Sequence, residues 1–238
     1  MVTLGNFLFR YRNHIFPLVF LAIVFLDAPR YPWGSARLDR ALDGVGILLA
    51  VVGQALRACV IGLAYIARGG RHGKVYADDL VTEGLFAHSR NPLYAGNICV
   101  FTGLFIILNS YVGWFMGIPA VLVAYWALVF AEEDFLRRKF GAAYEDYCRD
   151  VNRFIPSLTG LRATMSSMRF HWQRVIRKEY GSTWTWITVV IGLVLWQRVA
   201  VEGFEATRSA VPGYLAAWGA VTVLYALARY MKKTGRLS

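Results

Sequence analysis

The stretch Arg90-Asn91-Pro92-Leu93-Tyr94-Ala95-Gly96 introduces two apolar runs of membrane length, residues 94–111 and 112–131. The acidic pair Glu132-Glu133 follows the second run directly. Because only a short turn fits between the runs, we expect a tight helical hairpin that crosses a bilayer twice. Such a hairpin returns the 90–96 turn and the acidic pair to one membrane face. The pattern therefore predicts a polar, charged site at a membrane surface, where a water-soluble reagent can meet a lipid.

The composition of the whole chain is typical of a membrane protein. Hydrophobic residues make up 57% of the 238 residues, and the mean hydropathy is +0.42. Several segments approach the roughly 20 apolar residues that cross the hydrocarbon core of a bilayer. We predict six spans, at 13–27, 44–66, 94–111, 112–131, 183–200 and 211–230. The expected fold class is an all-α, polytopic transmembrane helical bundle with about six membrane spans and a polar site at its cytosolic face.

The first predicted span is the weakest, because its apolar core is short and contains Pro17. Arg10 and Arg12 precede this core, as basic residues precede the core of a secretory signal peptide. No small-x-small cleavage pattern follows before Asp27. We therefore expect a retained helix.

Basic residues set the predicted orientation. With both termini in the cytosol, the cytosolic segments hold 20 of the 26 Lys and Arg residues and the outer loops hold 4. This bias follows the positive-inside rule. It also accounts for the net charge of +11 without nucleic acid, since basic segments at a membrane surface attract anionic lipid headgroups. We expect an integral membrane protein of a bacterial-type inner membrane rather than of the endoplasmic reticulum, with anionic lipid headgroups among its partners and no nucleic acid.

The chain divides into three predicted parts. Residues 1–43 form an N-terminal membrane arm, residues 44–156 carry the dense polar patterning, and residues 157–238 combine a basic linker with two further spans. The linker, 157–180, mixes five basic residues with apolar ones, which favours an interfacial amphipathic helix. The three cysteines and four histidines lack the spacing of metal ligands, so no metal site is expected.

The central part resembles the isoprenylcysteine carboxyl methyltransferase and phospholipid methyltransferase superfamily of integral-membrane enzymes. The resemblance rests on ordered motifs that cover about 110 of the 238 residues. They are Gly53-x-x-Leu56-Arg57, Leu80-Val81-Thr82-Glu83-Gly84-Leu85-Phe86, the 90–96 stretch, Glu132-Glu133, Phe140-Gly141-x-x-Tyr144-x-x-Tyr147 and Val151-Asn152-Arg153-Phe154-Ile155-Pro156. The chain departs from the family pattern at Asn91, which replaces the usual His, and at Leu85 and Phe86, which replace Pro and Tyr.

The resemblance implies an enzyme that binds S-adenosylmethionine, releases S-adenosylhomocysteine and takes its methyl acceptor from the bilayer. The residues expected to contact the cofactor lie in three of these motifs: Leu80, Thr82, Gly84, Leu85, Asn91, Pro92, Tyr94, Glu132 and Glu133. Glu132 and Glu133 can accept charge-assisted hydrogen bonds from the amino group or the ribose. Gly84 permits close approach of the backbone. Asn91 can both donate and accept, which suits the cofactor carboxylate.

Three arginines are expected to have a catalytic role by positioning the substrates: Arg90, Arg153 and Arg57. Methyl transfer to a good nucleophile needs alignment more than acid–base chemistry. Arg57 falls inside a predicted span, where a guanidinium requires a polar cavity or a partner. It is therefore either a structural brace or an anchor for an anionic group.

Two ordinary roles compete with ligand binding. An acidic run such as Glu132-Glu133-Asp134 stabilises the start of a helix without any ligand. Residues Leu136, Phe140, Tyr144, Tyr147 and Val151 recur at helical spacing, which also indicates simple packing. Tyr144 and Tyr147 can therefore serve the core or the ligand, and Arg153 can serve as a basic anchor.

The sequence predicts S-adenosylmethionine-dependent methyl transfer to a lipid or lipid-linked acceptor at the cytosolic membrane face. Two alternatives stay open: a non-catalytic lipid-binding or transport protein on the same fold, and a methyltransferase for a small diffusible acceptor such as a thiol. The acceptor group itself, whether carboxylate, amine or thiol, is left open by the sequence.

Overall fold

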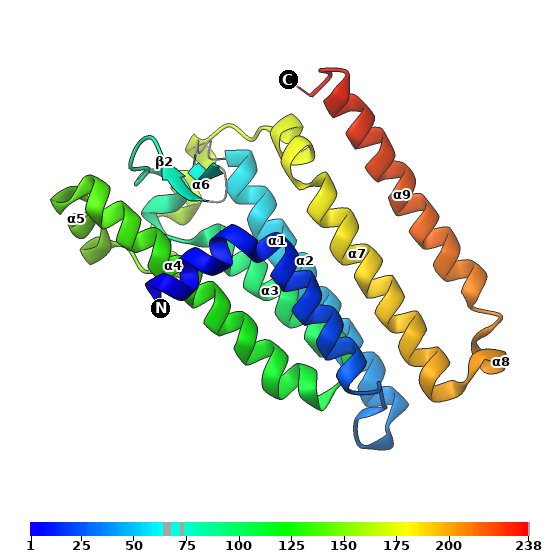
Figure 1. Ribbon diagram of the computed structural model, residues 1–238. Coiled ribbons are helices and arrows are strands. Elements are labelled where there is room, and N and C mark those ends of the chain that lie inside the picture. Colours follow the sequence, from blue (N-terminus) through cyan, green and yellow to red (C-terminus); the bar gives the residue numbers. More distant parts are fainter. Residues whose placement is uncertain (64–67, 72–73, 238) are drawn as a thin grey trace.

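Long antiparallel helices form the body of the protein (Figure 1). The structure is a computed structural model, and it describes residues 1–63, 68–71 and 74–237. The long helices are α1 (Val2–Leu26), α2 (Ala36–Leu63), α3 (Pro92–Leu108), α4 (Ile118–Phe140), α7 (Trp172–Glu202) and α9 (Val211–Lys233). Each overlaps one predicted span, which confirms the all-α, polytopic fold class. The last residues of the span predicted over 44–66 lie outside the described residues.

Among the described residues, five helical segments are long and apolar enough to cross a membrane, with α4 counted from Gly113. Helix α3 has 17 residues and is shorter than the predicted span 94–111. It ends early because Asn109 adopts a left-handed conformation (φ 50°) and turns the chain. A π-helical segment, η3 (Gly113–Gly117), then leads into α4. This turn closes the predicted hairpin and brings the start of α3 and the end of α4 to the same end of the bundle.

Helices α2 and α3 pack through glycines. A Cβ atom on Gly53 would lie 2.5 Å from the carbonyl oxygen of Gly96, and one on Gly46 would lie 2.6 Å from that of Gly103. Small residues at these points let two backbones meet directly, as is common between membrane helices. The pair α2–α3 is therefore the tightly packed centre of the bundle.

The remaining helices attach to this centre in different ways. Helix α1 packs against α4, where Gly5 meets the backbone of Ala127. Helix α7 packs on α2 and α3, and α9 packs along α7 (Figure 1). The first two helices thus do not form a hairpin with each other, although they are adjacent in the sequence.

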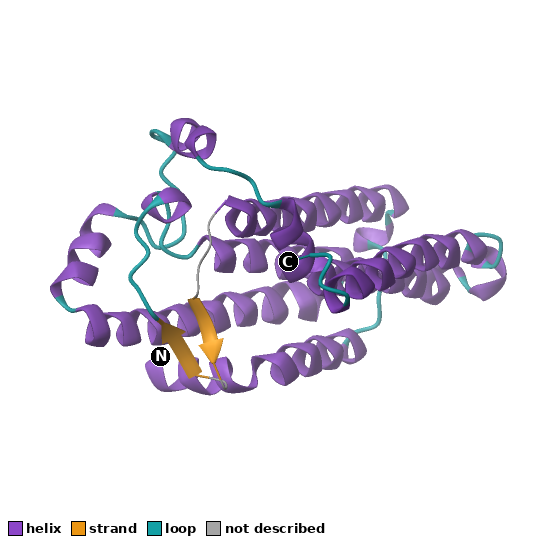
Figure 2. Ribbon diagram, turned by 90° about the horizontal axis from the view of Figure 1, so that it is seen from above, coloured by secondary structure: helices purple, strands orange, loops and turns teal. Residues whose placement is uncertain are grey.

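Short elements cover the end of the bundle where α3 begins (Figure 2). An antiparallel hairpin, β1 (Arg68–Arg71) and β2 (Lys74–Ala77), was not predicted from the sequence. The 3₁₀ turn η2 (Gly84–Ala87) precedes α3, and the short helices α5 (Ala142–Asp150) and α6 (Leu161–Ser167) follow α4. The expected single amphipathic helix over 157–180 is wrong, since the chain leaves helical conformation after α6 and α7 begins only at Trp172. At the opposite end lie η1 (Pro32–Gly34) and α8 (Phe204–Thr207).

Candidate functional site

The turn before α3 is held by the segment that follows α5. The amide of Arg90 donates to the carbonyl of Asn152 (2.9 Å), and the amide of Asn91 donates to the carbonyl of Arg153 (3.1 Å). The side-chain amide of Asn91 also donates to the Arg153 carbonyl (3.2 Å). Pro92 begins α3, where its missing N–H costs nothing. Two motifs about 60 residues apart in the sequence therefore form one paired structure.

Glu133 lies at the centre of a cluster of arginines. Arg153 binds it at two points, with Nε 3.0 Å from Oε1 and Nη2 2.8 Å from Oε2. Arg90 and Arg137 each bring a guanidinium nitrogen to 3.6 Å. The Glu133 side chain is 1% exposed, and a buried carboxylate is costly unless it is paired. The hydrogen bond to Glu133 raises the pKa of Arg153. Three guanidinium groups therefore share the carboxylate of Glu133.

One donor in this cluster lacks an acceptor. The Nε of Arg90 is buried and makes no hydrogen bond within the described residues, and the Arg90 side chain is 9% exposed. A buried N–H of this kind loses its hydration without compensation. An oxygen-bearing ligand would satisfy it. Arg90 is therefore the strongest indication of a ligand in the cluster.

The acidic pair does not begin a helix. Helix α4 continues to Phe140, so Glu132 and Glu133 lie in its interior, and the alternative based on a helix start is wrong. The helix continues because basic residues follow the acidic ones at a spacing of four, as in the Asp134–Arg138 pair. Both glutamates are buried, at 8% and 1% exposure.

A cavity of about 580 Å³, which we call the polar cavity after its Thr, Ser and Glu side chains, opens between the 80–87 loop and α6, and apolar side chains line it as well. Its walls are Leu63, Val81, Thr82, Glu83, Gly84 and Ala87, together with Thr164, Ser167 and Met168 from α6 and the residue after it. Thr82 and Gly84, both predicted to contact the cofactor, thus line one cavity. Leu80 and Leu85, predicted with them, pack instead in apolar clusters, Leu80 beside Leu136 and Leu85 beside Val60.

Helix α6 contributes to the site, which was not predicted from the sequence. His88 fixes this helix, because its ring nitrogens lie 2.8 Å from the carbonyl oxygen of Ser157 and 2.9 Å from Oγ1 of Thr164. His88 is 6% exposed. The only sequence signal was a histidine two residues before Arg90, which by itself does not indicate a partner 76 residues away.

Arg57 does not join the arginine cluster in the described structure. Its Nε and Nη2 bind Glu179 of α7 at 2.8 and 2.7 Å, and its Nη1 donates to Asn97. Gln54 also donates to Glu179 (2.9 Å). Of the two roles considered for Arg57, this geometry is that of a structural brace between α2 and α7.

The aromatic residues of the motifs pack tightly. Tyr144 is 1% exposed, and burial raises the pKa of its hydroxyl. The hydroxyl of Tyr147 donates to the carbonyl of Phe86 (2.7 Å), which ties α5 to the 80–87 loop. The Tyr94 ring packs against the Tyr125 ring at a tilt, with ring centres 5.8 Å apart. Tyr144 and Tyr147 therefore pack in the core, which is one of the two roles that their helical spacing indicated.

An apolar cavity of about 160 Å³ lies between α1, α3 and α4. It is lined by Leu8, Ile15, Phe16, Val19, Phe20, Phe101, Phe105, Gly117, Ala120, Val121 and Ala124. Tyr125 connects this cavity with the start of α3, because its ring packs on Phe16 (5.4 Å) and on Tyr94 (5.8 Å). Apolar surface thus extends from the membrane interior toward the turn at Asn91.

Within the described ranges, no group of three or more His, Cys, Asp or Glu residues is arranged to hold a metal ion.

Parts of this chain are similar in sequence to known proteins. The family model described as phospholipid methyltransferase matches residues 44–143. The chain is 28% identical over 201 residues to the nickel-cobalt-cadmium resistance protein NccN of Alcaligenes xylosoxydans xylosoxydans. This match covers 80% of this chain and 86% of that protein. It is 28% identical over 131 residues to a protein-S-isoprenylcysteine O-methyltransferase of Tribolium castaneum, over 51% of this chain and 44% of that protein. No solved structure matches.

Proposed function

We propose that this chain is a membrane enzyme that transfers a methyl group from S-adenosylmethionine to a lipid or lipid-linked acceptor, because residues 44–143 match the phospholipid methyltransferase family model and part of the chain is similar to an isoprenylcysteine O-methyltransferase. The observation that carries the proposal is the buried, unsatisfied Nε of Arg90 beside the Glu133 cluster. It lies at the end of a bundle of membrane-length helices, next to the matched motif at Asn91.

The residues present fit the methyl donor. S-adenosylmethionine carries a carboxylate, an ammonium group, a ribose and an adenine, and when bound it supplies a methyl group on a sulfonium centre. Arg90 would bind the carboxylate by a charge-assisted hydrogen bond. Glu132 would accept from the ammonium group or the ribose. The polar cavity at Thr82 and Gly84 is large enough for an adenosine group.

The remaining residues would align and enclose the reactants. Arg153 is fixed by Glu133 and would present the outer side of its guanidinium to an anionic group of the acceptor. The apolar cavity between α1 and α4 offers space for part of a lipid chain. Helix α6, fixed through His88, forms one wall of the polar cavity and would help to enclose the bound cofactor. Alignment in a dry site provides much of the rate in this kind of transfer.

Orientation is part of the proposal. The concentration of basic residues at the end that carries the site favours a cytosolic location for this end and for both termini, since 20 of the 26 Lys and Arg residues belong to it. The soluble cofactor would then enter from the cytosol and the acceptor from the bilayer.

Calorimetry on the full chain tests cofactor binding. The protein in lipid nanodiscs should bind S-adenosylmethionine or S-adenosylhomocysteine, and Arg90→Gln should weaken binding. Arg137→Gln is the matched control, because Arg137 also lies 3.6 Å from Glu133 but is 42% exposed. Absence of binding by the wild-type protein in both detergent and nanodiscs would refute the proposal.

Turnover separates the catalytic role from the alternatives. Methyl-labelled cofactor, incubated with the protein and extracted lipids, should yield a labelled lipid. Cofactor binding without turnover would favour a lipid-binding or transport role on the same fold. Label in a small water-soluble product would favour a diffusible acceptor such as a thiol.

A further inference from the structure

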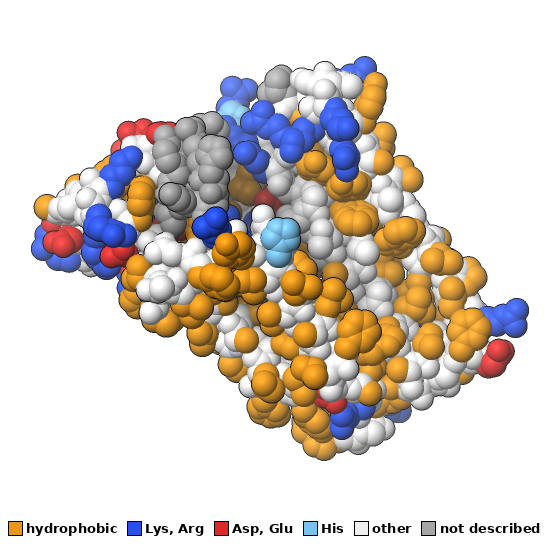
Figure 3. Space-filling view, viewed as in Figure 1, with side chains coloured by type: hydrophobic (Ala, Val, Ile, Leu, Met, Phe, Trp, Pro, Cys, Tyr) orange, Lys and Arg blue, Asp and Glu red, His pale blue; other side chains and the backbone are white. Residues whose placement is uncertain are grey.

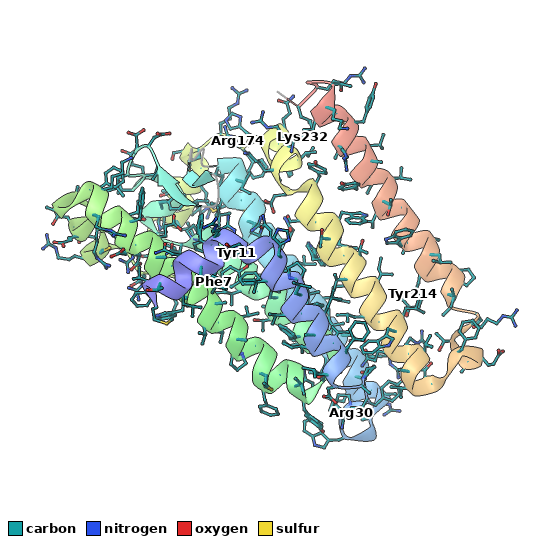
Figure 4. The ribbon with its side chains drawn as sticks, in the orientation of Figure 1. Phe7, Tyr11, Arg30, Arg174, Tyr214 and Lys232 are labelled. Carbon is teal, nitrogen blue, oxygen red and sulfur yellow. The ribbon has the colours of Figure 1, made fainter. Side chains whose placement is uncertain are left out.

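Helices α7 and α9 lie outside the residues matched by the family model, and their shared end is strongly basic. The basic residues there are Arg169, Arg174, Arg177, Lys178, Arg229, Lys232, Lys233 and Arg236. Figure 3 shows basic side chains gathered over the upper ends of these helices, and Figure 4 labels Arg174 and Lys232 at that end. The one acidic residue of this region, Glu179, is already bound to Arg57.

Several arginines elsewhere in the protein pair with carboxylates, as in Arg57–Glu179, Arg153–Glu133 and Arg198–Glu202. In the described part of the chain, no carboxylate pairs with Arg169, Arg177, Lys178, Arg229, Lys232, Lys233 or Arg236. Their charge is therefore not neutralised by the protein.

Neutral aromatic groups hold several of these cations at the contact between the two helices. The ring of Tyr225 packs on Tyr180 (5.3 Å) and on Trp184 (5.0 Å), which joins α9 to α7. The Nζ of Lys232 lies 5.1 Å from the centre of the Tyr180 ring, and Nη1 of Arg229 donates to the Tyr225 hydroxyl (2.9 Å). Cation–π contacts orient a charge without cancelling it.

Helical spacing adds a third cation at the same contact. Arg177 precedes Tyr180 by three residues and Trp184 by seven, so it lies on the face of α7 that meets α9. Arg229 and Lys232 follow Tyr225 by four and seven residues, so they lie on the face of α9 that meets α7. We call Arg177, Arg229 and Lys232 the seam cations.

Below the seam cations, the helices offer apolar surface for lipid chains. Helix α9 packs mainly on α7, and its most apolar stretch contains no buried residue. Leu224 and Leu227 are 66% and 53% exposed. A ligand with an anionic head and two apolar chains matches this arrangement of charge above an exposed apolar surface.

We propose that the seam cations bind the phosphate of an anionic phospholipid from the surrounding bilayer, whose chains lie along the outer faces of α7 and α9. The lipid neutralises the seam and holds α9 against the rest of the bundle. This site is separate from the Glu133 cluster, and the proposal does not depend on methyl transfer.

Native mass spectrometry of the full chain in a neutral detergent tests the site. Added phosphatidylglycerol should be retained, and phosphatidylcholine with the same chains should be retained much less. The triple variant Arg177→Gln, Arg229→Gln and Lys232→Gln should lose this preference, by about fivefold per charge and about a hundredfold in total. Inorganic phosphate at millimolar concentration should not compete, since it has no chains.

A matched variant controls for diffuse attraction between a basic surface and an anionic lipid. Arg162→Gln, Lys178→Gln and Lys233→Gln remove three exposed charges at the same end, and these residues form no ion pair in the described structure. The control should keep the preference for phosphatidylglycerol. Equal loss in both triple variants overturns the proposal in favour of a diffuse surface effect. If the seam variant does not fold, equal retention of the two lipids by the wild-type protein, or competition by phosphate, overturns it.

Discussion

Arg57 of α2 and Glu179 of α7 form a two-point ion pair, with nitrogen–oxygen distances of 2.8 and 2.7 Å, across 122 residues of sequence. The side chains are 18% and 5% exposed. Ser182 and Gln54 also donate to the carboxylate, at 3.0 and 2.9 Å. The pair therefore fixes the C-terminal helices to the glycine-packed centre of the bundle.

Removal of one partner should be strongly destabilising. We expect Glu179→Leu to lower the free energy of unfolding by about 3–5 kcal/mol, because it leaves a buried guanidinium without a counter-charge. The double variant Arg57→Leu with Glu179→Leu should recover most of this loss. Denaturation in mixed micelles measures both. As a control, Asp134→Ala breaks an exposed pair with Arg138 and should change stability by about 0–1 kcal/mol. If the double variant is as unstable as Glu179→Leu alone, Arg57 and Glu179 do not form a structural brace between α2 and α7.

The sequence predicted the main geometry of the candidate site but not its ion pairs. Two apolar runs with a short turn require a hairpin, and a hairpin requires that the turn at Asn91 and the acidic pair meet. The identity of the partners depends on contacts over long sequence distances. Nothing in the pattern around Glu179 indicates that it accepts from Arg57, and nothing around Glu133 indicates three arginines.

Three local features of the structure differ from the predictions for similar reasons. The β-hairpin has no alternation of apolar and polar residues in Arg68–Arg71, so a period-two pattern could not reveal it. The interior position of the acidic pair depends on the basic residues that follow it in α4. The division of the 157–180 linker into α6 and the start of α7 follows from tertiary contacts, such as the bond from the His171 amide to the Gly62 carbonyl (2.9 Å).

The two buried glutamates should differ in their effects. Glu133→Gln removes the charge that three arginines share, so it should lower both stability and cofactor affinity. Glu132→Gln should weaken cofactor binding by roughly 10- to 150-fold with the fold retained, as expected when a charged hydrogen-bond partner is lost. Calorimetry and thermal unfolding on the same samples separate the effects. Unchanged affinity in both folded variants would assign the pair to structure alone.

A side chain at Gly84 should be unfavourable. Its φ of +63° favours glycine, and a Cβ atom would lie 2.8 Å from Cε of Met168. Gly84→Ala should therefore distort the polar cavity and weaken cofactor binding. Gly181→Ala is the matched control, because Gly181 lies in helix α7 and a Cβ atom there would meet nothing within 4 Å. That change should leave binding unaltered and slightly stabilise the helix, by about 0.5–1 kcal/mol. Equal affinity of Gly84→Ala and wild type would remove this loop from the cofactor site.

Asp27 should make stability depend on acidic pH. Burial tends to raise the pKa of its carboxyl group, but hydrogen bonds from Ser110 and the Val112 amide and the charge of Arg30 together lower it below the ordinary 3.8. A lowered pKa stabilises the folded state above pH 3.8, and this contribution is lost as the pH falls through the folded-state pKa. Asp27→Asn should reduce stability at neutral pH and weaken the acid dependence, as measured by thermal unfolding across a pH series. An unchanged acid profile would show that other groups produce it.

Arg90 should bind the cofactor, and Arg153 should bind the acceptor. The unsatisfied Nε of Arg90 favours the cofactor, so Arg90→Ala should raise the cofactor Kd. Arg153 is fixed by Glu133 at two points, and Arg153→Ala should raise the acceptor KM or lower kcat more than it changes the cofactor Kd. Arg153→Lys should rescue poorly, because an ammonium group lacks the planar fork that contacts both carboxylate oxygens. Initial rates at varied acceptor, with Kd from calorimetry, separate these effects. If Arg153→Ala loses cofactor binding and handles the acceptor normally, both arginines serve the cofactor, and an uncharged or amine acceptor becomes the better hypothesis.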